Sequence, residues 1–213
     1  DYVTIKGLTI IADTNEGSAI RITFSDHFTL DNNVLLGKEL TGNSFDLTVV
    51  YAVLARSFKA RYNIIQNGHV NMYYSDNMTN QPSEIEDVVI ENNIFGNASY
   101  HSSQFVGVKT LLYKNNIVEQ KGNAGTSTGV RFNNSRYAEI ENNKISFDST
   151  QNLGLGIYVY DSDSVLIANN MVNQFAGDAT TYGIATSDIG LARVYHNTVK
   201  VKNSALHSYQ NDT

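Results

Sequence analysis

The sequence predicts an all-β fold, a right-handed parallel β-helix of about eight coils with 23–30 residues in each coil. Two observations lead to this prediction. An asparagine motif recurs at nearly constant intervals, and the segments around it alternate apolar and polar residues with the period of a β-strand. A unit of this size cannot bury its own apolar side, so it must stack on copies of itself. The crossover rule for parallel strands favours right-handed winding.

The second asparagine of each motif is used here as the landmark of the repeat. The intervals between successive landmarks are 26, 30, 30, 23, 27, 27 and 27 residues, and the last three are identical. Apolar residues recur five and three positions before the landmark and two positions after it, and a second short strand begins thirteen positions before it in most units. The landmarks are Asn33, Asn63, Asn93, Asn116, Asn143, Asn170 and Asn197, with Gly7 in the same place in the first unit.

The landmark predicts a tight corner between two strands. Asparagine and glycine are the residues that most readily adopt the left-handed backbone conformation which such a corner needs. In a stack of coils, each asparagine side chain can also hydrogen-bond to its copies above and below, which satisfies a buried amide. A row of asparagines that binds sugar or metal is the functional alternative to this ladder.

Composition favours strands and turns and argues against several functions. The 213 residues carry a net charge of −6 without a basic block, so we expect no nucleic-acid partner. No stretch approaches the ~18 consecutive apolar residues of a membrane span. The chain has no cysteine, which excludes disulfides and thiolate chemistry and is compatible with export.

Charged residues form one column when the repeats are aligned. The sign alternates through five consecutive units, and stacked parallel strands lie about 4.8 Å apart. Each charge would therefore have opposite neighbours above and below, which indicates a device that fixes the register rather than a binding site. This column, two positions before the landmark, consists of Asp31, Arg61, Glu91, Lys114 and Glu141, followed by Ala168 and Tyr195.

A second face carries aromatic rings, amides and two arginines. The column twelve positions before the landmark contains Arg21, Tyr51, Asn71, Gln104, Arg131, Tyr158 and Ala185, and the column ten before it contains Thr23, Val53, Tyr73, Val106, Asn133, Tyr160 and Ser187. Flat rings with hydrogen-bonding neighbours suit a long carbohydrate, although exposed tyrosine is also common on strands for reasons of propensity alone. The predicted glycan-binding residues are Tyr51, Tyr73, Tyr74, Arg131, Asn133, Tyr158 and Tyr160.

Two long loops interrupt the repeat. Between Ser75 and Val88 twelve residues replace the two that separate Ser25 from Phe28, an insertion of ten that contains the only proline, Pro82. Insertions in solenoids usually project on one face, which is often the binding face. The segment 36–49 is a second long loop in a different turn.

Three carboxylates are the best candidates for catalysis. Asp161 and Asp188 occupy the same column in consecutive units, Asp163 is close in sequence, and Arg131 would lie nearby. Glycoside hydrolysis uses paired carboxylates, and carboxylates can also hold Ca²⁺. Aspartate and serine are equally common as turn residues, so ordinary turn chemistry is the alternative. We expect no metal centre and no cofactor, with Ca²⁺ as the one possible exception.

The repeated unit, Φ-x-Φ-x-N-N-x-Φ, resembles the coils of right-handed parallel β-helix proteins of the pectate-lyase-like class over nearly the whole chain. Residues 166–205, with the pieces IANN, YGI and VYHNTV, further resemble repeats of very large secreted or cell-surface β-helix proteins of bacteria. The resemblance implies right-handed winding and a secreted or cell-surface location. Pectate-lyase-like enzymes carry a dense cluster of Asp and Lys or Arg on one strand face, whereas the charges of this chain are scattered.

The sequence therefore predicts a single β-helix domain over residues 1–213, either part of a longer chain or covered at its ends by additional coils or a capping partner. The predicted function is a non-catalytic module of a secreted or cell-surface protein, adhesin-like or glycan-binding, with a polysaccharide or cell-surface glycan as partner. The alternative is a polysaccharide-degrading enzyme, a lyase or glycoside hydrolase such as a phage tailspike depolymerase, that uses Asp161, Asp163, Asp188 and Arg131.

Overall fold

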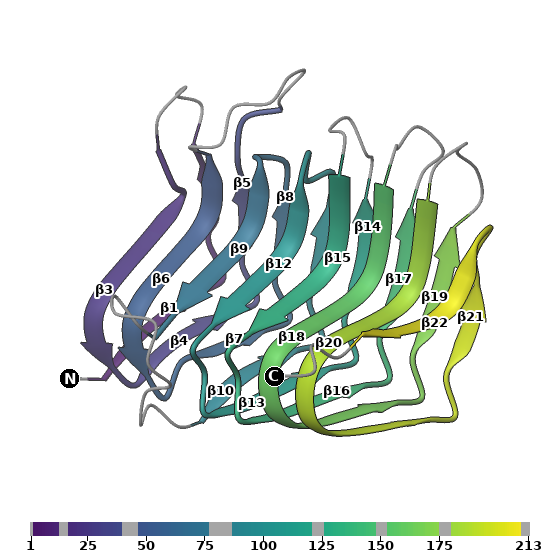
Figure 1. The fold of residues 1–213 in the computed structure, drawn as a ribbon. Helices are drawn as coiled ribbons and strands as arrows, with labels where there is room; N and C mark the ends of the chain where they lie inside the picture. Colours follow the sequence, from purple (N-terminus) through teal and green to yellow (C-terminus); the bar gives the residue numbers. More distant parts are fainter. Residues whose placement is uncertain are drawn as a thin grey trace.

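The chain forms a parallel β-helix, as the sequence predicts (Figure 1). The computed structural model describes residues 2–12, 17–39, 47–76, 87–120, 126–147, 153–174 and 180–209. Within these residues it contains strands and turns but no helix, and hence no helix able to cross a membrane. The strands pair in parallel with their counterparts in the next unit.

Each coil contributes three strands, and these assemble into two sheets (Figure 1). The short sheet has eight strands: β2 (Thr9–Ile11), β5 (Val34–Leu36), β8 (Ile64–Gln66), β11 (Ile94–Gly96), β14 (Ile117–Gln120), β17 (Lys144–Phe147), β19 (Met171–Gln174) and β21 (Thr198–Lys200). It begins one residue after each landmark asparagine, which is why the motif predicts its position well.

The other two strands of each coil belong to the long sheet of 14 strands. The strands that precede the short sheet are β1 (Val3–Lys6), β4 (Phe28–Asp31), β7 (Lys59–Arg61), β10 (Val88–Glu91), β13 (Thr110–Lys114) and β16 (Tyr137–Glu141). Those that follow it are β3 (Ile20–Asp26), β6 (Thr48–Arg56), β9 (Val70–Ser75), β12 (His101–Val106), β15 (Thr126–Asn133) and β22 (Ser204–Tyr209).

Two strands bend through a corner and so join both parts of the long sheet. β18 (Leu153–Ala168) pairs with β15 through its first half and with β16 through its second half. β20 (Thr180–Tyr195) lies beside it along both halves. In Figure 1 these two strands curve around the lower front of the molecule. The candidate carboxylates belong to them, with Asp161 and Asp163 on β18 and Asp188 on β20.

The number of fully stacked turns is smaller than the sequence predicts. The short sheet has eight strands, but its end strands β2 and β21 have a neighbour on one side only, which leaves about six turns stacked on both sides. The end coils accordingly expose apolar side chains, with Leu8 51% and Leu206 54% accessible. That additional coils or a capping partner cover these ends stays a prediction.

The landmark asparagines form a continuous ladder, and six of the seven are at most 2% exposed. From Asn33 to Asn170, the Nδ2 group of each donates to the Oδ1 atom of the next at 2.9–3.1 Å. The backbone N–H of each donates to the same Oδ1 atom at 2.8–3.0 Å. The ladder therefore satisfies amides that would be costly to bury alone.

The corner itself is made by the residue before the landmark, so this part of the prediction is wrong. The left-handed residues, with φ of 55–58°, are Asn32, Tyr62, Asn92, Asn115, Asn142, Asn169 and His196. Lys6 pairs with Asp31, so Gly7 (φ 67°) corresponds to Asn32, and Leu8 takes the landmark place in the first coil. The two asparagines of the motif thus have separate roles: the first permits the backbone turn, and the second supplies the buried hydrogen bonds.

Inside the coils, one hydrophobic core runs through the described part of the chain. Aromatic rings stack along its axis in the series Phe28, Phe58, Tyr74, Phe105 and Phe132, with ring centroids 5.3–6.5 Å apart. Phe28 and Phe58 share one register position, and Tyr74, Phe105 and Phe132 share another on different strands, so the inward positions of successive coils form continuous columns.

The charge column has the predicted register. Lys6, Asp31, Arg61, Glu91, Lys114 and Glu141 follow one another along the long sheet. Lys6 Nζ lies 2.9 Å from an Asp31 carboxylate oxygen, and Lys114 Nζ lies 3.8 Å from Glu141. Because these side chains are partly exposed, each pair contributes no more than about 1 kcal/mol, and the column chiefly disfavours coils stacked out of register.

Candidate functional site

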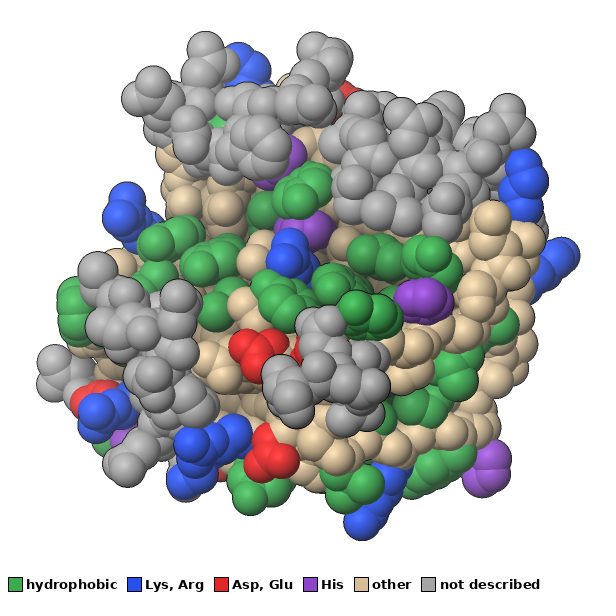
Figure 2. All heavy atoms as spheres, in the orientation of Figure 1, with side chains coloured by type: hydrophobic (Ala, Val, Ile, Leu, Met, Phe, Trp, Pro, Cys, Tyr) green, Lys and Arg blue, Asp and Glu red, His purple; other side chains and the backbone are tan. Residues whose placement is uncertain are grey.

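The outward side chains of the long strands form the surface that we call the tyrosine face. Figure 2 shows it from the front, as a band of hydrophobic and tyrosine side chains interrupted by basic ones. Strand register gives its two columns. The first contains Arg21, Tyr51, Tyr73, Gln104, Arg131, Tyr158, Ala185 and His207, and the second contains Thr23, Val53, Ser75, Val106, Asn133, Tyr160, Ser187 and Tyr209.

The register differs from the prediction in one coil. Tyr73 lies in the column where Asn71 was expected, next to Tyr51 and Gln104. Asn71 is buried, and its amide donates to the carbonyl groups of Asn67 at 2.8 Å and Gly96 at 3.0 Å. Ser75 corresponds to Thr23 rather than to Ser25, so the insertion after it is shorter by two residues. The loop residues 77–86 and 40–46 lie outside the described residues.

Tyr74 does not belong to the tyrosine face, which corrects the prediction. Its ring is fully buried in the core between Phe58 and Phe105. Its hydroxyl donates to the Ala55 carbonyl oxygen at 2.6 Å, and burial raises the pKa of the phenol. Because consecutive strand residues face opposite sides, the outward position of Tyr73 requires the inward position of Tyr74.

One end of the tyrosine face is a stack of three side chains. The rings of Tyr51 and Tyr73 are 5.5 Å apart at an interplanar angle of 14°. The Arg21 guanidinium carbon lies 5.1 Å from the centre of the Tyr51 ring, within the range of a cation–π interaction. Each side chain comes from a successive coil, so the strand spacing itself brings the rings into contact.

The centre of the face is organised around Arg131. The rings of Tyr158 and Tyr160 are 5.1 Å apart, and the guanidinium carbon lies 5.9 Å and 4.9 Å from their centres. Arg131 Nη2 donates to the Tyr160 hydroxyl at 2.8 Å, and Nη1 lies 3.3 Å from His101 Nε2. These contacts hold the guanidinium in one position above the tyrosine pair.

His101 is a part of this site that the sequence did not predict. Burial chiefly, together with the positive charge of Arg131 and the neighbouring His69, lowers the pKa of its imidazole to about 3. The ring is therefore neutral at physiological pH, so its Nε2 atom accepts a hydrogen bond from Arg131. In the sequence, the one indication that His101 belongs to this site is its position. It lies three residues before Gln104, which is the neighbour of Arg131 in the adjacent coil.

The candidate carboxylates lie at a corner beside the tyrosine face. Tyr160 pairs with Ser187 and Ser162 with Ile189, which places Asp161 beside Asp188 as expected. Both have left-handed backbones, with φ of 50° and 52°, a conformation that aspartate in turns adopts readily. Nonpolar residues take the same conformation at the equivalent corner of other coils: Phe24 (53°) and Leu54 (52°).

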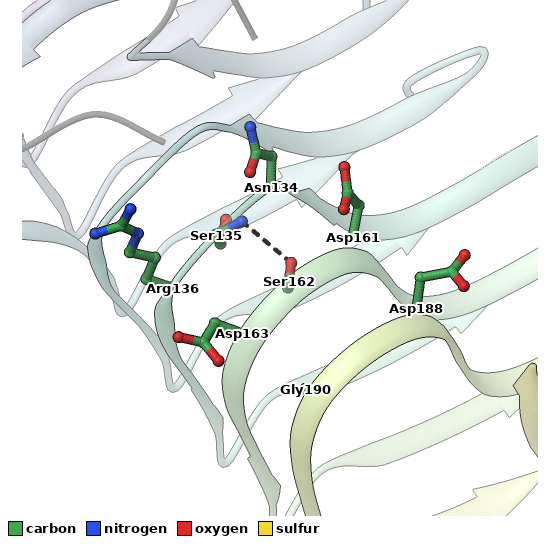
Figure 3. A pocket seen from close by; sticks show the side chains of 8 residues that line it. All are labelled: Asn134, Ser135, Arg136, Asp161, Ser162, Asp163, Asp188 and Gly190. Carbon is green, nitrogen blue, oxygen red and sulfur yellow. Dashed lines mark hydrogen bonds between the residues drawn. The ribbon is translucent and has the colours of Figure 1, made fainter. Parts of the chain in front are cut away.

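Figure 3 shows the shallow depression that these residues line, with a volume of about 230 Å³. Asp161 and Asp188 lie on adjacent strands, whereas the Asp163 carboxylate points away from both. The backbone N–H of Ser135 donates to Ser162 Oγ at 3.1 Å, which ties the two coils together at its floor. Within the described ranges, no group of three or more His, Cys, Asp or Glu side chains is arranged to hold a metal ion.

These features define the class of the protein as a parallel β-helix with a tyrosine- and arginine-rich outer face. No protein-family model matches the chain, and no curated protein sequence matches it. Its fold is similar to that of the surface protein and adhesin PfbA of Streptococcus pneumoniae, with a TM-score of 0.60 and 16% sequence identity. The match covers 98% of this chain and 66% of that one, and at this identity it shows the fold alone.

Proposed function

We propose that the chain is a non-catalytic β-helix module of a secreted or cell-surface protein, which binds a glycan along the tyrosine face. The observation that carries this proposal is the alignment of outward tyrosine and arginine side chains over successive coils. The likeness of the fold to a protein described as a surface adhesin supports the location.

The arrangement of the rings determines how a glycan would be held. The rings of Tyr51 and Tyr73 contact each other, and those of Tyr158 and Tyr160 also contact Arg131. The faces of these rings are thus largely covered by one another and by Arg131. A glycan would therefore contact the tyrosine hydroxyl groups and ring edges, together with the neighbouring Asn133 amide. Because the rings are already fixed by stacking, binding costs little side-chain entropy.

Alanine in place of Tyr158 is expected to weaken glycan binding roughly 10- to 50-fold, since truncation of a central aromatic side chain typically costs about 1.5–2.5 kcal/mol. Binding to a panel of acidic and neutral polysaccharides, measured by surface plasmon resonance, tests this expectation. Tyr137→Ala is the matched control, because Tyr137 is 53% exposed on β16, outside the tyrosine face. An equal loss of glycan affinity in Tyr158→Ala and Tyr137→Ala, or no binding to any glycan in the panel, would contradict the proposal.

The second candidate function is polysaccharide degradation. The observation that favours it is the depression lined by Asp161, Asp163 and Asp188 together with Arg136. A retaining or inverting glycoside hydrolase needs two carboxylates on either side of the scissile bond, and a lyase needs a base with a charge-neutralising group. If the chain is an enzyme, a polysaccharide lyase or a glycoside hydrolase fits these residues.

A further inference from the structure

The positive charge of Arg131 has no negative partner among the described residues. The guanidinium is half-buried, and its two hydrogen-bonding neighbours are the Tyr160 hydroxyl and the His101 ring. No described carboxylate forms an ion pair with it, whereas Lys6, Arg56 and Lys114 are all paired. A partly buried charge among neutral groups is costly, and an arriving anion would offset that cost.

The neighbours of Arg131 cannot supply the missing charge. His101 is neutral because burial, chiefly, holds its pKa near 3. The Tyr158 phenol is protonated at physiological pH, and burial raises its pKa further above that range. Neither side chain therefore carries a negative charge that would compensate the guanidinium.

Negative charge lies on the other side of the tyrosine pair. Asp188 contributes to the raised pKa of Tyr158, and Arg131 opposes that shift, so both charges act on the same ring. Asp161 lies beside Asp188 at the corner. A ligand across Tyr158 and Tyr160 would meet a cation at one end and carboxylates at the other.

We propose that Arg131 is the recognition site for a single carboxylate of an acidic sugar, and that Asp161 and Asp188 require the adjoining sugar to be neutral. This inference rests on the proposed glycan binding and names its ligand class. The guanidinium binds the carboxylate through its outward N–H groups, a charge-assisted contact stronger than a neutral hydrogen bond. The aspartates accept hydrogen bonds from hydroxyl groups and repel a second acidic sugar.

The test compares two probes that differ only at the carboxyl groups of the acidic sugars. One is an oligosaccharide of alternating glucuronic acid and neutral sugar residues, and the other is the same oligosaccharide after reduction of its carboxyl groups to hydroxymethyl groups. By isothermal titration calorimetry, the acidic form is expected to bind about tenfold more tightly, as a charged hydrogen bond in a partly dry site allows.

Three variants show which residues cause the difference in affinity between the two probes. Arg131→Gln is expected to abolish the preference for the acidic form, and Asp188→Asn to increase it about two- to threefold by removing repulsion. Asn suits the left-handed backbone at position 188, so the fold is kept. Arg193→Gln is the matched control, because Arg193 is an exposed arginine on the second half of β20, outside the tyrosine face, and it should leave the preference unchanged. Thermal unfolding midpoints confirm that each variant is folded.

Three results overturn the inference. Equal binding of the two probes, with a loss in Tyr158→Ala, would reject acidic recognition but keep the proposed glycan binding. A preference that survives Arg131→Gln would place the acidic site elsewhere. If neither probe nor any other glycan binds, both the inference and the proposed function fail.

Discussion

Alanine in place of Asn143 is expected to destabilise the chain by about 3–5 kcal/mol, among the largest losses for a single polar side chain. Asn143 Oδ1 accepts hydrogen bonds from the backbone N–H of Asn116 at 2.8 Å and from its Nδ2 group at 3.1 Å. Its own Nδ2 group donates to the Tyr113 carbonyl oxygen at 3.0 Å and to Asn170 Oδ1 at 2.9 Å. All four partners are buried, so each would lose a bond that water cannot replace.

The neighbouring residue provides the control. Asn142 is exposed and has a φ of 55°, so its role is conformational. Asn142→Gly should be nearly neutral and Asn142→Ala should cost about 1 kcal/mol, whereas Asn143→Gly should cost as much as Asn143→Ala. Urea unfolding followed by circular dichroism measures all four variants. If substitutions at positions 142 and 143 lower the free energy of unfolding equally, the asparagine ladder does not provide the stability assigned to it.

Alanine in place of Gly156 is expected to cost about 2–3 kcal/mol, because the added methyl group has no space. A Cβ atom there would collide with the carbonyl oxygen of Gly183 in the next coil and with the Val172 side chain. A backbone oxygen cannot swing away as a side chain can, so the coils themselves must separate. Gly129 is in the same situation, with a Cβ atom 2.6 Å from the Gly156 carbonyl oxygen.

Gly96→Ala separates this steric effect from the general effect of replacing a glycine in a strand. The nearest atom to a Cβ at Gly96 is Gln66 Nε2 at 3.3 Å, at the end of a flexible side chain. This variant should change stability by less than about 1 kcal/mol. Differential scanning calorimetry of both variants gives the comparison. A Gly156→Ala protein as stable as Gly96→Ala would mean that the coils are packed less closely than the structure shows.

The fold was predictable from the sequence because a β-helix repeats the same local pattern in every coil. Apolar positions around Asn93, Asn143 and the other landmarks recur in one register, and each coil contacts only its neighbours. The charge column confirmed that register, since Asp31, Arg61 and Glu91 lie side by side as expected. Local periodicity and stacking therefore determine most of the architecture.

The errors in the candidate site also have a physical origin. Strand side chains repeat with a period of two, so a shift of two residues leaves every side chain on the same face. The alternation pattern therefore could not detect that Tyr73, rather than Asn71, lies beside Tyr51. Tyr74 was assigned to the surface because an aromatic side chain suits either face of a strand, and only the stacked Phe58 and Phe105 rings show that it is inward.

The contacts of Arg131 could not be predicted at all. They depend on how deeply His101 is buried and on which rotamers bring Tyr160 under the guanidinium, and neither follows from spacing. The sequence placed Arg131, Tyr158 and Tyr160 close together, but the neutral state of His101 follows only from its surroundings in the fold.

The proposal of binding without catalysis is tested most directly by measuring binding and product formation in one sample. The chain is incubated with each polysaccharide that it binds, and new reducing ends and unsaturated products are followed by colour reaction and ultraviolet absorbance. We predict saturable binding with no product above a heat-inactivated control. Product that accumulates with time, and that disappears in Asp161→Asn, would contradict this account and identify the chain as a polysaccharide-degrading enzyme.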